Sequence, residues 1–136
     1  MIRVVFDTNI LISGVLYSGK PSRLIDVAVE GEIELVSSVE IIQEFNAVIS
    51  RPKFHLSKEE QQLFTNFIIR LSTIVATKSK FKVVKQDPDD DMVILSAFDG
   101  RAPYIVSGDP HLLGLKEVLG IRILTANQML KMLGKI

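Results

Sequence analysis

The sequence contains no cysteine, and this absence excludes several kinds of site. Without thiols the chain cannot form a disulfide scaffold, bind a metal through thiolates or use a cysteine nucleophile. Nor does any apolar run approach the roughly 18 uninterrupted residues of a membrane-spanning helix. Asp7 interrupts the apolar N-terminal stretch, which disfavours a secretory leader. We therefore expect a soluble, cytoplasmic protein with no membrane partner.

An excess of charge of one sign is also lacking. The 136 residues include 16 Lys or Arg and 16 Asp or Glu, so the net charge is zero and gives no overall sign of nucleic-acid binding. A local basic patch could still bind nucleic acid. Hydrophobic residues make up 47% of the chain, which is ample for a core and leaves apolar surface for an interface. The length predicts a single domain spanning residues 1–136.

Short apolar runs alternate with helical patterns along the chain. The expected strands are Ile2–Phe6, Ile33–Val36, either Ile74–Thr77 or Phe81–Val84, Tyr104–Val106 and Ile121–Leu124. Helical spacing and capping residues predict helices at Ile10–Leu16, Pro21–Glu30, Val39–Ile49, Lys58–Leu71, Met92–Phe98 and Ala126–Leu133. This alternation is typical of a parallel sheet covered by helices on both faces, which binds ligands beyond the carboxyl ends of its strands.

Acidic residues occur where these elements meet. Asp7 directly follows the first expected strand, Asp109 follows the fourth, Asp91 precedes the helix at Met92, and Glu44 lies inside the helix after the second strand. Each of three acids also has an ordinary structural explanation. Asp109 could belong to a turn, Asp91 could cap a helix, and Glu44 could lie on a solvated helix face. These explanations are weakest for Asp7, because a carboxylate at the end of a buried strand is costly to desolvate unless a positive charge is near.

Neighbouring residues support two of these acids. Thr8 and Asn9 follow Asp7 and can orient its carboxylate by hydrogen bonding. Glu44 lies beside a buried apolar stripe, although Glu40, one turn earlier, is a competing candidate. Hard oxygen ligands without His or Cys select Mg²⁺ or Mn²⁺, and the cation relieves the repulsion between carboxylates. One or two such ions can activate water and stabilise the leaving oxyanion in phosphodiester cleavage.

Four segments carry a family resemblance: Val4–Asn9, Ser38–Phe45, Asp90–Ala97 and Ile105–Asp109. Over essentially its whole length, the chain resembles PIN-domain proteins, and in particular the VapC-type toxin ribonucleases of toxin–antitoxin pairs. The resemblance implies a three-layer α/β/α fold with a five-stranded parallel sheet in the order 3-2-1-4-5. It further implies that the catalytic and metal-binding residues are Asp7, Glu44, Asp91 and Asp109, supported by Thr8, Asn9, Asp90 and Ser107.

The same resemblance implies a function. It indicates a Mg²⁺- or Mn²⁺-dependent endoribonuclease that acts on RNA, forms a homodimer and has a cognate antitoxin partner. The chain departs from the toxins at His111, where relatives often carry another acid, and it has extra acids near Asp91. A basic run from Lys78 to Lys85 could contact phosphate, although a solvated edge explains its pattern better.

Two other functions stay open. One is a non-catalytic PIN-like module that binds RNA or protein, which four intact acids disfavour. The other is a phosphatase or phosphoacceptor that uses Asp7 as a nucleophile, as an Asp at the end of a first strand does in other α/β folds. Against the latter, Asn9 stands where such nucleophiles often have a second Asp.

Overall fold

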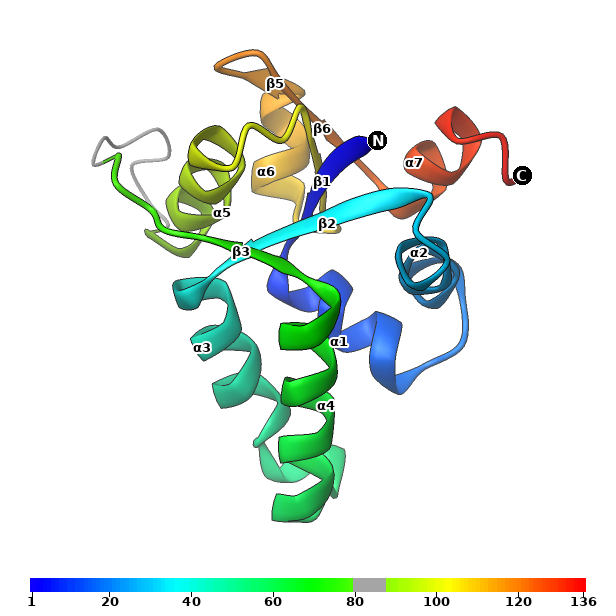
Figure 1. Ribbon diagram of the computed structural model, residues 1–136, viewed down its shortest axis with the longest axis vertical. Helices are drawn as coiled ribbons and strands as arrows, with labels where there is room; N and C mark the ends of the chain where they lie inside the picture. The colour runs from blue at the N-terminus through cyan, green and yellow to red at the C-terminus, as the bar shows by residue number, and fades with distance from the viewer. Residues whose placement is uncertain (80–87) are drawn as a thin grey trace.

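A central sheet of six strands, in the order β3-β2-β1-β4-β6-β5, organises the molecule (Figure 1). The computed structural model describes residues 1–79 and 88–136. The strands are β1 (Ile2–Phe6), β2 (Ile33–Ser38), β3 (Thr73–Val75), β4 (Tyr104–Val106), β5 (Glu117–Val118) and β6 (Ile121–Leu124). All neighbours pair in parallel except β5, which runs antiparallel to β6.

The expected α/β class and the order of the five longer strands are confirmed, with β6 in the fifth position. The expected count of five is wrong, because β5 adds a sixth strand at the edge. Leu119 and Gly120 both have positive φ, 54° and 78°, and form the two-residue turn of the β5–β6 hairpin. A two-residue strand is too short to produce a recognisable alternation of apolar and polar residues. The third strand overlaps the first of its two expected positions, whereas Phe81–Val84 lies outside the described residues.

Helices cover both faces of the sheet. They are α1 (Thr8–Leu16), α2 (Lys20–Val29), α3 (Val39–Ile49), α4 (Lys58–Leu71), α5 (Pro88–Asp99), α6 (Pro110–Leu115) and α7 (Ala126–Met132), with a 3₁₀ turn, η1 (Pro52–Phe54). Figure 1 shows α5 and α6 on one side of the sheet and α1, α2, α3 and α4 on the other. Helix α6 was not among the expected elements, although Asp109 followed by Pro110 is a typical helix start.

The register of the sheet determines which side chains lie under each helix layer. Val36 pairs with Val5, Val5 with Ile105, and Ile105 with Ile123, so these four side chains share one face. Gly100, at the end of α5, packs on this face: a Cβ there would lie 2.6 Å from Val36 Cγ1. All four are buried, which explains why β1 and β4 are almost continuously apolar in sequence.

The long helix α4 differs from its sequence pattern. Its apolar positions repeat at helical spacing, yet Leu63 is 64% exposed and Phe67 38% exposed, and Ile68 is the fully buried member of the set. Much of the apolar face of α4 is therefore uncovered. Among the described residues, no helix combines the length and the apolar character needed to cross a membrane.

Candidate active site at the carboxyl ends of the strands

Buried polar side chains collect where β1, β2 and β4 end. Because side chains alternate along a strand, the residues two positions after Val5, Ile105 and Val36 emerge on the α5 face. These residues are Asp7, Ser107 and Ser38, and all three are buried. Parallel strands end at a common edge, so the register alone brings these polar groups to one end of the sheet.

Asp7 is the most buried acid of this edge, with 5% of its surface exposed. It caps α1: Oδ1 accepts a hydrogen bond of 2.9 Å from the Ile10 N–H, and Oδ2 accepts one from the Ser107 hydroxyl. Burial raises the pKa of Asp7 above its ordinary value, the nearby Asp109 charge raises it further, and the two hydrogen bonds oppose this rise. Within the described chain, no Lys or Arg forms an ion pair with Asp7 or Asp109.

Ser107 links Asp7 to Asp109. Its hydroxyl donates to Asp7 and accepts the Asp109 backbone N–H at 3.0 Å. Asp109 is half-buried and caps α6, with Oδ1 accepting the His111 N–H at 2.8 Å. This capping chain holds two carboxylates near each other at the ends of neighbouring strands, where mutual repulsion favours a bound cation.

Glu44 is connected to the neighbour of Asp7 in the chain, Thr8. The Thr8 hydroxyl donates to Glu44 Oε2 at 2.9 Å, so Thr8 orients Glu44 rather than Asp7. The reason is geometric, because Thr8 is the first residue of α1 and faces the adjacent helix α3. The competing residue Glu40 instead accepts the Thr77 hydroxyl at 2.6 Å, and this bond holds its pKa below the ordinary value. Glu44 is therefore linked to the residue that follows Asp7, whereas Glu40 is linked to Thr77, beyond the end of β3.

Asp91 lies in the first turns of α5 and is buried. Five residues further along α5, the Ser96 hydroxyl donates to Ser38 Oγ at 2.8 Å, which fixes α5 against the end of β2. Ser38 in turn caps α3 by accepting the Ile41 N–H. The helix therefore runs from the carboxyl edge of the sheet, near Asp91, toward Gly100 at the opposite end. The Ser38–Ser96 pair was not foreseen from the sequence.

The donor chemistry of this edge fits a hard divalent cation. Asp7, Glu44, Asp91 and Asp109 supply carboxylate oxygens, and the buried Asp7 has a raised pKa of the kind that a cation would reverse. Their present arrangement is looser than a finished coordination sphere. Among the described residues, no three acidic or histidine side chains are grouped closely enough to surround one ion.

Other expected participants lie apart from this cluster. Asn9 is exposed, and its side chain makes no hydrogen bond within the described part of the protein. His111 is also exposed and contributes its backbone N–H, rather than its ring, to Asp109. The side chain of Asp90 and most of the basic run, from position 80 on, lie outside the described residues. The Lys78 N–H donates to Asp99 Oδ2 at 2.7 Å.

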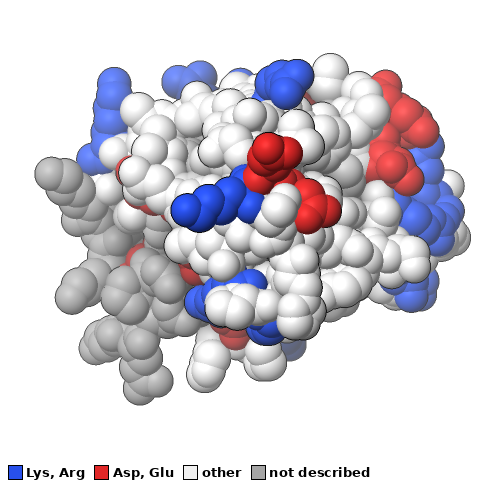
Figure 2. Space-filling view, turned by 90° about the horizontal axis from the view of Figure 1, so that it is seen from below, with Lys and Arg blue, Asp and Glu red and all other residues white. Residues whose placement is uncertain are grey.

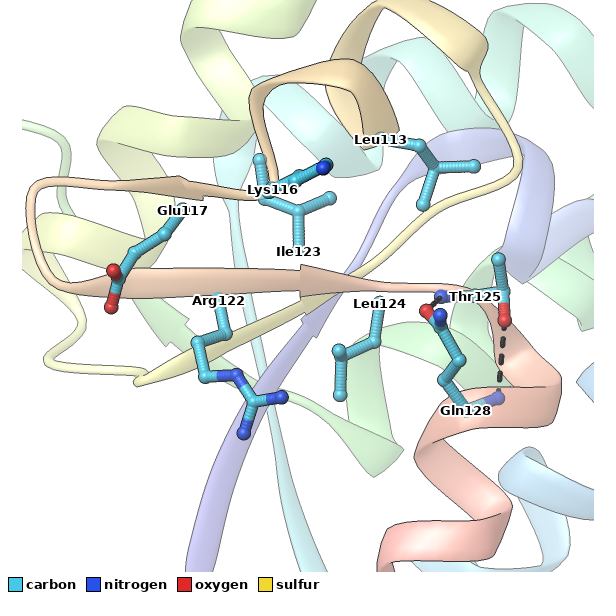
Figure 3. Close-up of a pocket in the computed structure, with 8 residues that line it drawn as sticks. All are labelled: Leu113, Lys116, Glu117, Arg122, Ile123, Leu124, Thr125 and Gln128. Atoms are coloured by element: carbon cyan, nitrogen blue, oxygen red, sulfur yellow. Dashed lines mark hydrogen bonds between the residues drawn. The ribbon is translucent and has the colours of Figure 1, made fainter.

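Charged side chains are dispersed over the face of the molecule shown in Figure 2. On the face shown in Figure 2, Lys and Arg side chains stand in small groups, interspersed with Asp and Glu and separated by large uncharged areas. Any contact with a polyanion on this face would be local. An open hollow of about 420 Å³ with two cations, Lys116 and Arg122, occurs elsewhere, at the outer edge of β6 (Figure 3).

Comparison with known proteins connects this geometry to a family. The PIN-domain family model matches residues 3–111, which includes all four acids. Among solved structures, the chain is similar to the crystal structure of VapBC2 from Rickettsia felis bound to a DNA fragment from their promoter, with a TM-score of 0.67 and 13% identity. That match covers 91% of this chain and 98% of the other, and at this identity it shows a common fold. No curated protein matches the sequence. The family match over most of the chain shows that this protein belongs to the PIN-domain family.

Proposed function

We propose that the chain is an endoribonuclease that hydrolyses RNA phosphodiester bonds with Mg²⁺ or Mn²⁺, and that it is the toxin of a toxin–antitoxin pair. Asp7, Glu44, Asp91 and Asp109 would hold the metal. One observation carries the proposal: Asp7 is buried beside Asp109, and within the described chain neither carboxylate has a basic partner. Burying such a charge is costly unless a cation offsets it.

The residues around the acids have defined tasks in this proposal. Ser107 and the Ile10 N–H hold the two oxygens of Asp7, and Thr8 holds Glu44, so the carboxylates are oriented before any ligand arrives. Ser107 also fixes the backbone at Asp109. A bound divalent ion would lower the pKa of water and offset negative charge on the scissile phosphate. The buried floor formed by β1 and β4 keeps bulk water to one side of the acids.

A phosphoacceptor role for Asp7 is the main catalytic alternative. It lacks support from position 9, where such nucleophiles often have a second Asp and this chain has an exposed Asn9. A non-catalytic module would have the same fold, but it would not require its acidic side chains to be ionised. Substitution of Asp7 distinguishes these possibilities.

The test is cleavage of end-labelled single-stranded RNA by the purified chain in Mg²⁺, in Mn²⁺ and in EDTA. We expect cleavage with either metal, none in EDTA, and loss of cleavage in Asp7→Asn. The matched control, Asp26→Asn, changes an exposed acid on α2 and should cleave like the unmodified chain. A folded protein that cuts no RNA with either metal, or an active Asp7→Asn variant, would refute the proposal. A phosphoryl group trapped on Asp7 would establish the phosphoacceptor alternative.

The proposal includes an antitoxin partner and a homodimer. Its support is the resemblance to toxin ribonucleases, the similarity to a structure described as VapBC2, and the apolar surface that the fold leaves uncovered. Leu63 and Phe67 of α4 line an open hollow of about 370 Å³ together with residues of α1 and α2. An apolar segment of an antitoxin would cover side chains that water otherwise surrounds.

A further inference from the structure

The hollow at the outer edge of β6 adjoins the acid cluster through two backbone hydrogen bonds. It lies between α6, the β5–β6 hairpin and the start of α7 (Figure 3). Leu124, on its wall, accepts the Ser107 N–H at 2.9 Å. Leu113, on the opposite wall, donates its N–H to the Asp109 carbonyl at 2.9 Å. Ser107 and Asp109 are therefore each joined by one backbone hydrogen bond to a residue that lines this hollow.

The charges that face the hollow are predominantly positive. Lys116 and Arg122 are exposed, and neither side chain forms an ion pair or hydrogen bond with another described residue. Figure 3 shows them on opposite sides of β6: the Lys116 side chain extends toward Leu113 of α6, and the Arg122 side chain extends from the other side of the strand. Glu117 is the one acid in the lining, and its carboxylate points toward the hairpin turn.

The backbone fixes the position of both cations. Lys116 has a φ of 60° and a ψ of −51°, a conformation that non-glycine residues rarely adopt, and its carbonyl accepts the Ile123 N–H at 2.9 Å. Arg122 is held in the sheet by pairing with Tyr104 on one side and Glu117 on the other. Because both backbones are anchored, binding a ligand would have to order only the two side chains and not the main chain.

We propose that this edge hollow binds the sugar-phosphate backbone of RNA beside the scissile position, with Lys116 and Arg122 each contacting a phosphate. The inference rests on the proposed ribonuclease function, because a cluster of carboxylates repels RNA and the affinity must come from nearby cations. Arg122 precedes Leu124 by two residues, about 7 Å along the strand. Its contact therefore falls on a phosphate set back from the carboxyl edge of the sheet, rather than on the one that is cleaved.

The experiment measures binding rather than cleavage. A fluorescently labelled single-stranded RNA 12-mer is titrated with the full chain in EDTA, which keeps the RNA intact, at several salt concentrations. The test variant is Lys116→Gln/Arg122→Gln. The matched control is Arg51→Gln/Lys58→Gln, which removes two exposed cations near the start of α4, at the opposite end of the molecule in Figure 1.

Each phosphate contact contributes about 0.7 to the slope of log affinity against log salt for a single strand. Loss of two contacts should therefore reduce the slope by about 1.4, so that between 50 and 200 mM salt the unmodified chain loses roughly sevenfold more affinity than the test variant. The control variant should keep the slope of the unmodified chain. Equal slopes for the test variant and the unmodified chain, or an equal reduction in both variants, would overturn the inference.

The outcome is separable from the proposed function. If the slope falls as expected while the unmodified chain cleaves no RNA with either metal, the RNA-binding edge stands and the ribonuclease proposal fails. If the chain cleaves RNA and the slopes are unchanged, the ribonuclease proposal stands and the edge is not its RNA contact.

Discussion

Substitution of Ser107 by Ala tests whether one hydroxyl maintains the buried acid pair. Ser107 is fully buried, donates to Asp7 and accepts the Asp109 N–H. Replacement leaves a buried carboxylate short of one donor, and a hydrogen bond to a charged group contributes about 1.5–3 kcal/mol. We expect a loss of about 2 kcal/mol in the free energy of unfolding at neutral pH, or roughly 8 °C in Tm. Urea titration followed by circular dichroism measures the change.

The loss should depend on pH in a direction that the structure determines. The pKa of Asp7 is raised above 3.8 in the folded protein, so the stability linked to its protonation is fully present below pH 3.8 and lost as the pH rises through the folded pKa. The hydrogen bond from Ser107 lowers the pKa of folded Asp7. Ser107→Ala therefore raises this pKa further, and it increases the loss of stability at pH values above the pKa. The difference between variant and unmodified chain should shrink toward pH 3.8.

A matched control is Ser50→Ala, because Ser50 is exposed and its hydroxyl bonds only the Asn46 carbonyl of its own helix. Its effect should stay within about 0.5 kcal/mol at every pH. The reasoning fails if Ser107→Ala is as mild as this control, or if its effect at neutral pH does not exceed its effect in acid.

Three further predictions concern the acids, the core and the apolar surface. Glu44→Gln should slow metal-dependent RNA cleavage by about 100-fold or more, whereas Glu40→Gln should leave the rate essentially unchanged; reversal would assign the site to Glu40. Gly100→Ala should lower the free energy of unfolding by about 1–3 kcal/mol, measured in urea, because its Cβ would meet Val36 Cγ1 at 2.6 Å and the Ser96 carbonyl at 2.8 Å; an unchanged midpoint would contradict the packing. Phe67→Asp should abolish co-purification with the protein encoded beside this gene, whereas Ile69→Asp, at a similarly exposed position of α4, should not; equal retention would place the partner elsewhere.

The sequence predicts most of the fold because the central elements are simple. Val4, Val5 and Phe6 are buried on both faces, and such strands are nearly continuous apolar runs. The strand order followed from the resemblance and is confirmed for the five longer strands. The short elements β5 and α6 were missed, since two and six residues are too few to establish a period.

The position of Asp7 was predictable from the sequence, but the hydrogen bonds around the candidate acids were not. Asp7 could be placed at the end of a buried strand from its sequence context alone. That Thr8 bonds Glu44 rather than Asp7 depends on how α1 meets α3, and the Ser38–Ser96 pair depends on where α5 crosses the sheet. Neither contact leaves a local sequence signal, because the partners are 36 and 58 residues apart.

The most direct test of the account is a crystal structure of the protein grown with Mn²⁺, with the ion located by its anomalous scattering. We expect one or two anomalous peaks at the carboxyl edge of the sheet, within coordination distance of Asp7 and Asp109, with Glu44 and Asp91 completing the ligands. Saturating Mn²⁺ that leaves this edge without a peak, or that binds only at other positions, would contradict the claim that these four acids form one metal site.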